Sequence, residues 1–390
     1  MDPLTSHRAS VVSPRRLIAL LLLSSFAEGK EKSAPDAPAN YQIQPGEFPP
    51  LEQAKLLAGE LIAVDHVNRA GVLRDDRTDD QTKAHWDRAH PFTLLPYALV
   101  MRHGAPAELR DIPLGTHLHA EFFEGPEVPQ FGGAYQGAIN DNNRRSKYLN
   151  YSRAARLEDD FSRDLRTGRK WRVEGVDAEA GKLTATNLPA NASARPAILD
   201  IGPDTRVWKG PGFGTLADLK PGATFLANHT LCTLTGPGRC TDLWLDDASR
   251  AAATARQTEV HRRHQRTHGL AGWIDTVDNQ RGVVSVTVFG GMDAALFEEF
   301  SAFAYFRAAV AEESLRTWDQ INDYKGGAGT AVRTQPAHPC DSGVRVTFTP
   351  AQLLEGFRPR RFVRLWPGDG KVIVGWPLGE PPKEERLFGQ

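Results

Sequence analysis

Five histidines stand at spacings that could hold a metal ion. His117 and His119 are two residues apart, and on a strand such side chains project to the same face of the sheet. His261, His264 and His268 are three and four residues apart, which places them on one face of a helix. Imidazole nitrogens bind zinc and copper. Each group is therefore a candidate zinc or copper site, and we expect no other cofactor.

Neither group is complete by itself. A third ligand for the pair at 117–119 could come from His85, His90 or His103, although the sequence does not place these near the pair. The helical group has no carboxylate or cysteine at a matching position, and a solvated basic helix end explains it equally well. The acidic stretch LEDDFSRDL from residue 157 lacks the ligand spacing of a calcium loop, so we expect a solvated turn there.

Arg102-His103-Gly104 follows an apolar run and resembles the start of the histidine phosphatase superfamily, whose histidine accepts the phosphoryl group. The resemblance implies a hydrolase with His103 as nucleophile. That family also needs a second histidine after a late apolar strand, but the later His-Gly at 268–269 follows a polar, helix-like stretch. Its α/β fold also disagrees with flanking segments that alternate as β-hairpins do. We interpret His103 as a loop residue and assign no catalytic residues, so we do not expect an enzyme.

An internal repeat explains the same segment. Shifted by 107 residues without a gap, residues 96–120 align with 203–227. The matched pairs include Pro96 with Pro203, Leu109 with Leu216, Asp111 with Asp218, and Gly115 with Gly222. Arg102-His103-Gly104 then aligns with Lys209-Gly210-Pro211, so the repeat does not require an imidazole. We expect the two leucines to be buried in equivalent places and the two glycines to form the same turn.

The pattern predicts a mainly β fold with two to three consecutive small antiparallel β-barrels, OB-like or SH3-like, plus a connecting helix and long loops. Val-Asp pairs at 64, 176 and 277 each precede a hairpin-like segment. The expected parts are a signal peptide over 1–29, a Pro-rich linker over 30–57, the first barrel over 58–123, an irregular insert over 124–168, the second barrel over 169–246, the helix over 247–269, and a looser β unit with a C-terminal tail over 270–390.

The repeats resemble uncharacterised exported bacterial proteins built from small OB-like barrel units. The stretches that carry the resemblance are LEDDFS at 157, RVWKGPGFGTLADL at 206 and LLEGFRPRRFVRL at 353. The resemblance implies an architecture and no activity, because it brings no catalytic residues to transfer.

The N-terminus is typical of an export signal, with a basic segment before the apolar run LIALLLLSSF at 17–26. We therefore expect a periplasmic or extracellular protein with no stable membrane span after cleavage. In an oxidising compartment Cys232 and Cys240, which flank a Gly-Pro-Gly turn, would form a disulfide. Nothing assigns a role to Cys340.

The sequence indicates only a broad class of function. The formal net charge of −1 gives no general attraction to nucleic acid, so we expect an unidentified cell-envelope protein or polymer as partner. The leading interpretation is an exported, non-enzymatic scaffold or binding protein of unknown ligand. The alternative is a periplasmic metal-binding protein that uses the histidine groups, and the phosphatase is the least favoured.

Overall fold

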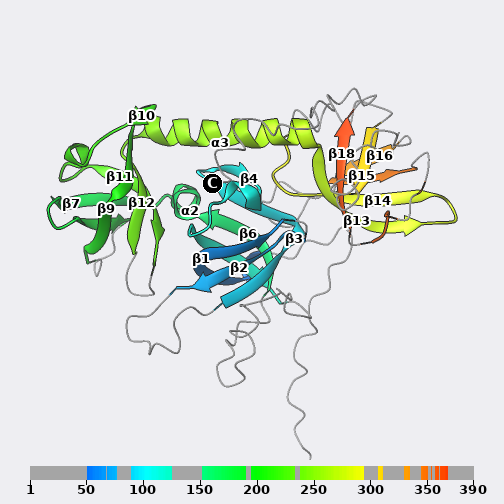
Figure 1. The fold of residues 1–390 in the computed structure, drawn as a ribbon, viewed down its shortest axis with the longest axis horizontal. Coiled ribbons are helices and arrows are strands. Elements are labelled where there is room, and N and C mark those ends of the chain that lie inside the picture. The colour runs from blue at the N-terminus through cyan, green and yellow to red at the C-terminus, as the bar shows by residue number, and fades with distance from the viewer. Residues whose placement is uncertain are drawn as a thin grey trace, which may run out of the picture. The chain divides into compact units, whose positions relative to one another are not determined.

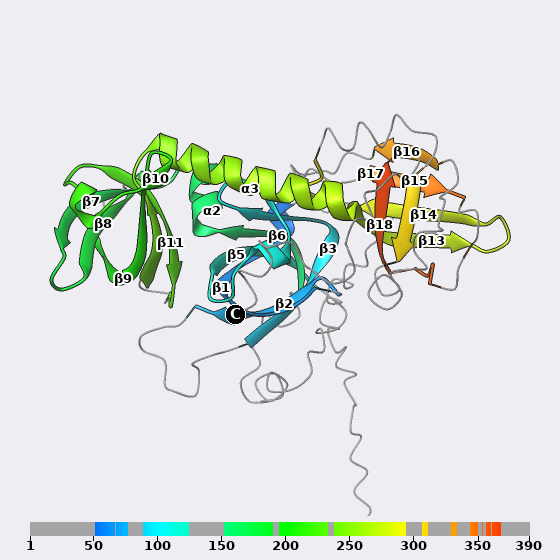
Figure 2. The same ribbon diagram turned by 45° about the horizontal axis from the view of Figure 1, so that its top comes forward.

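The structure is a computed structural model, drawn in Figures 1 and 2. It describes residues 51–66, 68–76, 89–124, 152–189, 195–232, 238–293, 306–310, 329–333, 344–349, 353, 356–359 and 361–367. The predicted signal peptide, most of the predicted linker, His85 and Cys340 lie outside these ranges.

The first barrel consists of β1 (Lys55–Asp65), β2 (Ala70–Asp75), β3 (Ala89–Arg102), β5 (His117–Phe123) and β6 (Arg153–Asp159), with the short β4 (Ala105–Ala107) on the end of β3. The strands pair in the order β2-β1-β5-β6-β3, and an additional β2–β3 pairing closes the circle. Its core contains Leu61, Leu73, Phe92, Leu118, Phe122 and Leu157, all buried. A mainly β fold with a closed barrel is therefore confirmed.

The second barrel repeats this plan (Figure 2). It consists of β7 (Lys170–Asp177), β8 (Lys182–Leu188), β9 (Ala197–Lys209), β11 (Thr224–Thr230) and β12 (Arg239–Trp244), with β10 (Gly212–Phe213) on the end of β9. The order is β9-β12-β11-β7-β8, closed by β9–β8. In each barrel one pairing, β3–β6 or β9–β12, is parallel, so the barrels are not purely antiparallel as the sequence suggested.

The Val-Asp pairs form the hairpins of all three β units. The carboxylate of Asp65 accepts a hydrogen bond from the backbone N–H of Asn68, and that of Asp177 accepts one from Ala180. Asp278 does the same for the N–H groups of Gln280 and Arg281. An aspartate that binds its own turn in this way fixes the chain reversal, which explains why the pair recurs at each hairpin.

The repeat holds in detail. The 3-10 turns η3 (Leu109–Asp111) and η4 (Leu216–Asp218) differ by the same 107 positions as β5 and β11, and φ is 85° at both Gly115 and Gly222. One expectation is wrong: Leu109 is buried, whereas Leu216 is only partly buried against the second core. The buried leucine of the second turn is Leu219, which matches Ile112.

The predicted irregular insert over 124–168 contains regular structure at its C-terminal end. Arg153–Asp159 is β6, which pairs with both β3 and β5 and completes the first barrel. Asp160–Thr167 is the helix α2, capped by Asp159 and ended by Gly168 at φ 69°. The first barrel thus extends beyond residue 123, and the predicted solvated acidic turn is a capped, largely buried helix start.

The predicted connecting helix is confirmed as α3 (Asp247–His268). The side chain of Asp246 accepts a hydrogen bond from the N–H of Ser249 and caps the helix, and the chain leaves it at Gly269. The helix contacts β4 of the first barrel, β9 and β12 of the second, and β13 and β18 of the third β unit. Among the residues described, no helix has the length and apolarity needed to cross a membrane.

The third β unit contains β13 (Leu270–Asp278), β14 (Val283–Val288), β15 (Phe306–Val310), β16 (Gly329–Arg333), β17 (Val344–Phe348) and β18 (Phe362–Pro367). They form one sheet in the order β15-β18-β13-β14-β17-β16. Its core contains Leu270, Val286, Phe348 and Leu365, all buried.

Candidate metal centre

His117 and His119 lie on one face of β5, as their spacing predicts. Both are buried, and their ring centroids are 4.7 Å apart in a T-shaped arrangement. The strand pairs with β1 and β6 on either side, so its backbone is fixed in the barrel wall. The two imidazoles therefore form a rigid pair that faces the start of α2.

Asp160 lies between the two imidazoles. It is the first residue of α2, where a carboxylate is favoured by the helix dipole. Its Oδ1 lies 2.8 Å from Nδ1 of His117 and 2.8 Å from Nε2 of His119. One potential ligand atom from each of these three residues lies within 4.8 Å of the others. The capping of α2 by Asp159 sets the position of this carboxylate.

A third histidine approaches from the second barrel. The backbone N–H of His229 on β11 donates to Asp160 Oδ2 over 2.9 Å, and its Nδ1 lies 3.1 Å from the same oxygen. Beside it, Asn228 accepts from the N–H of Phe161 and donates to Asp159. Three imidazoles thus surround one buried carboxylate at the contact between two barrels.

Opposite charges dominate the electrostatics of this cluster. Burial by itself would raise the pKa of Asp160, but the neighbouring His117 and His229 hold it well below its ordinary value. Burial would likewise lower the pKa of these two histidines, but Asp160 raises the pKa of both. The pKa of His119 is lowered, chiefly by burial. The attraction between Asp160 and its two neighbours thus favours the charged form of the carboxylate and of the imidazoles of His117 and His229.

Outer contacts orient the two imidazoles of β5. Nε2 of His117 lies 3.1 Å from Oδ1 of Asp76, which leaves Nδ1 to face Asp160. This carboxylate–histidine arrangement is typical of metal ligands, whose second nitrogen is held by an acidic partner. On the other imidazole, Nη1 of Arg163 lies 2.8 Å from Nδ1 of His119. That guanidinium opposes a bound cation and favours a proton on the Nε2 atom of His119.

Two imidazoles and a carboxylate are a donor set for zinc, and imidazole also suits copper. Bond lengths of about 2.0–2.2 Å place the ligand atoms of a tetrahedral site roughly 3.3 Å apart. The present 2.8 Å separations are hydrogen-bond distances. An ion that replaces the imidazole protons would need each imidazole nitrogen to move about half an ångström away from Oδ1 of Asp160.

The helix histidines have other partners. Nε2 of His261 lies 2.6 Å from the carbonyl oxygen of Gly291, and Nε2 of His264 lies 3.4 Å from Glu108. His268 stacks on His264 with centroids 4.2 Å apart. His261 and His264 are buried, so they are not the solvated face considered above. Within the described ranges these histidines do not join a group of metal-ligating side chains.

Of the three candidate third ligands, the two that the structure describes do not join the pair at 117–119. His90 is buried against the Phe122 ring, and His85 lies outside the described residues. His103 is in the two-residue turn that joins the antiparallel strands β3 and β4, as the repeat predicts. Its ring contacts Phe161 and Trp244.

The predicted disulfide is absent from the described structure, where Cys232 and Cys240 are buried free thiols. The β11–β12 register explains this, because the residue opposite Cys240 is His229 and not Cys232. Cys240 belongs to the core of the second barrel. Burial raises the pKa of the Cys232 thiol, an effect that the neighbouring His117 opposes.

The sequence interpretation missed Asp160 and His229. A second sequence match between the two barrels could have pointed to Asp160: DDFSR at 159–163 matches DDASR at 246–250. These stretches begin α2 and α3, and they do not follow the 107-residue offset. His229 aligns with Phe122 in that frame, so no pattern in the repeat distinguishes it.

Comparison of the chain with protein-family models, curated proteins and solved structures finds no match. The assignment of function therefore depends on the geometry of this cluster.

Proposed function

We propose that this chain is an exported metal-binding protein that holds a divalent transition ion, zinc or copper, through His117, His119 and Asp160. The observation that carries the proposal is the convergence of both imidazoles on one carboxylate oxygen, each at 2.8 Å. These two nitrogen–oxygen separations are within about half an ångström of those in a tetrahedral site, and all three ligand atoms lie within 4.8 Å of one another.

Two features of the surroundings favour a bound cation over a purely structural network, although the Arg163 guanidinium opposes it. Within the described part of the chain, Nε2 of His229 is buried without a hydrogen-bond partner, and such an orphaned nitrogen is costly in a protein interior. Rotation of this imidazole would offer a fourth ligand. Asp76 supplies the outer carboxylate that holds His117. A site with four protein ligands, in which His229 joins His117, His119 and Asp160, leaves no open position for a substrate. Such a closed site is typical of a storage or structural centre and not of a catalytic one.

The direct test is a titration of the full-length mature protein, first stripped with a chelator, with ZnCl2 and then CuCl2 by calorimetry. The proposal predicts one ion per chain. His119→Ala should weaken binding by at least the roughly 10–100-fold that the loss of an outer partner costs. His66→Ala, which removes an exposed imidazole, is the matched control and should bind as the wild type does. If the wild type takes up neither ion, the proposal is wrong.

A non-enzymatic scaffold is the second candidate. It is favoured by α3, which contacts both barrels and the third β unit. In that case the cluster around Asp160 is only an ion-paired joint between β5, α2 and β11. The scaffold hypothesis predicts that His119→Ala changes the stability of the protein and leaves its uptake of metal unchanged.

A further inference from the structure

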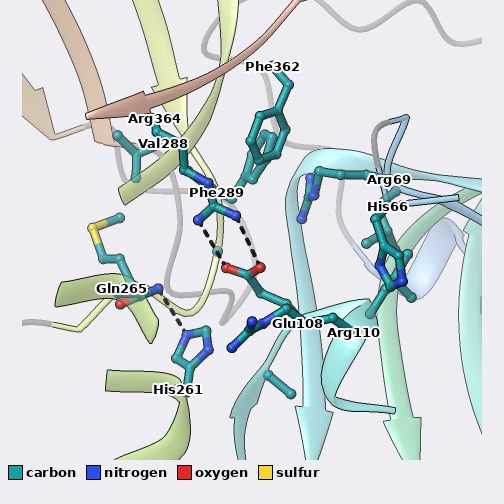
Figure 3. Close-up of a pocket in the computed structure, with 16 residues that line it drawn as sticks. His66, Arg69, Glu108, Arg110, His261, Gln265, Val288, Phe289, Phe362 and Arg364 are labelled. Atoms are coloured by element: carbon teal, nitrogen blue, oxygen red, sulfur yellow. Dashed lines mark hydrogen bonds and ion pairs between the residues drawn. The ribbon is translucent and has the colours of Figure 1, made fainter. Parts of the chain in front are cut away.

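A cavity of about 250 Å³ lies away from the histidine cluster, between the first barrel, α3 and the third β unit. Figure 3 shows its charged side chains: Arg69, Glu108 and Arg110 come from the first barrel, and Arg364 comes from β18. His261 and Gln265 of α3 line another side of it. A cavity enclosed by three elements can surround a small molecule.

Arg69 carries the unbalanced charge of this cavity. Its Nη1 donates to the carbonyl oxygen of Leu95 over 3.1 Å, and its guanidinium carbon lies 3.4 Å from the centre of the Phe289 ring. Among the described residues no carboxylate lies within ion-pair distance of it. Burial lowers the pKa of Arg69 to about 9, an effect that Glu108 only partly opposes. A guanidinium has five donors in a fixed fork, which suits an oxyanion.

Among the described lining residues the one acidic side chain, Glu108, already has partners. Both carboxylate oxygens of Glu108 lie 3.4 Å from the guanidinium of Arg364. Nε2 of His264 lies 3.4 Å from Oε2 of Glu108. Arg110, also in the lining, lies beside Asp111. Once these pairs are counted, the positive charge of Arg69 remains in surplus.

Apart from His66, the remaining lining is largely apolar and aromatic. Phe289 and Phe362 lie with ring centroids 5.5 Å apart. Leu94, Val288 and Met292 complete this wall. An inorganic anion would leave these surfaces unused, whereas a ring or branched chain attached to an acid would cover them.

We propose that this cavity is a binding site for a small aromatic monocarboxylate, with its carboxylate on Arg69 and its ring against Phe289 and Phe362. The anion supplies the counter-charge that Arg69 lacks among the described residues. The site is independent of the metal centre and does not require an ion there.

The test is calorimetric titration of the full chain with three probes: phenylacetate, its neutral analogue phenylacetamide, and inorganic phosphate. Phenylacetate should bind, and the other two should bind at least tenfold more weakly. Arg69→Met should weaken phenylacetate binding roughly ten- to a hundredfold, the equivalent of one charge-assisted hydrogen-bonded contact. Arg69→Lys keeps the positive charge but loses the two-pronged guanidinium, so its affinity for phenylacetate should lie between those of the wild type and Arg69→Met.

Arg281→Met is the matched control, because Arg281 is an exposed arginine in the β13–β14 turn. It should leave binding unchanged, and circular dichroism of each variant checks the fold. Equal binding of phenylacetamide would overturn the role of the charge, and equal binding of phosphate would overturn the role of the aromatic wall. No binding of phenylacetate to the wild type, or unaltered binding to Arg69→Lys and Arg69→Met, would overturn the site.

Discussion

His103 and Gly210 occupy the same backbone position in the two barrels. Their φ angles are 51° and 55°, and the backbone N–H of each donates to the carboxylate that caps the following helix, Asp159 or Asp246. The turn that seemed to be a phosphatase motif is therefore the joint between a barrel and its helix. Its left-handed conformation is required by the joint and not by an imidazole.

This conformation predicts the cost of a side chain at the glycine. Gly210→Ala should destabilise the protein by about 1 kcal/mol, because alanine is strained in the left-handed region. A Cβ at this position meets no atom within 4 Å, so strain is the only cost. The control is Gly212→Ala, which has equal space and no positive φ. Urea unfolding of both variants should show the larger loss at Gly210, and equal losses would contradict the explanation.

The two turn leucines should differ, although the sequence makes them equivalent. Leu109→Ala removes a buried side chain and should cost about 2–5 kcal/mol. Leu216 is only partly buried, so Leu216→Ala should cost about 1–2 kcal/mol. The measurement is the free energy of unfolding from denaturant titration. A larger loss for Leu216→Ala would contradict the packing described for η3 and η4.

Asp164 in α2 should make stability depend on pH. Burial and the nearby Asp160 raise its pKa from 3.8 to about 7. The folded protein then binds more protons than the unfolded chain between these values, so this group lowers stability as pH rises through that window. Asp164→Asn should therefore stabilise the protein by up to about 4 kcal/mol at pH 8 and have little effect at pH 4.

Thermal or urea unfolding at the two pH values measures this difference. Asp204→Asn, a change at an exposed aspartate, serves as the control and should show no such pH dependence. An equal effect of Asp164→Asn at pH 4 and pH 8 would show that Asp164 is ionised in the fold throughout.

Arg163 should compete with the metal ion. It holds Nδ1 of His119 and so favours a proton on the nitrogen that faces Asp160. Arg163→Met removes this hydrogen bond and a positive charge, so zinc should bind roughly tenfold more tightly, a gain of about 1.4 kcal/mol. Arg169→Met, at an exposed arginine just after α2, should change the affinity little. Weaker zinc binding by Arg163→Met would contradict this account of the site.

The sequence predicted those parts of the fold that follow from local chemistry. The repeat, its glycine turns and the capped helix α3 are visible in residue types, because turns and caps each demand particular side chains. The boundary of the first barrel was missed, because β6 comes after a long insert that breaks the 107-residue frame. In the second barrel the equivalent strand, β12, follows β11 after a short loop, so no long insert separates them.

The candidate site was half predicted. His117 and His119 share a face because of strand geometry, which the sequence reveals. Asp160 and His229 join them through the pairing of β5 with β6, the start of α2 and the contact of β11 with that helix. Such long-range contacts leave no periodic pattern. The prediction of a disulfide was wrong for a related reason, because strand register and not sequence spacing decides which residues face each other.

Anomalous diffraction at the zinc absorption edge, from crystals of the protein grown with equimolar zinc, tests the central proposal most directly. The account predicts one strong peak about 2.0–2.2 Å from a nitrogen of His117, a nitrogen of His119 and an oxygen of Asp160. The imidazole of His229, which also lies beside Asp160, should then have turned toward the ion. A peak at the α3 histidines instead, or ordered crystals with no peak between β5 and α2, would contradict it.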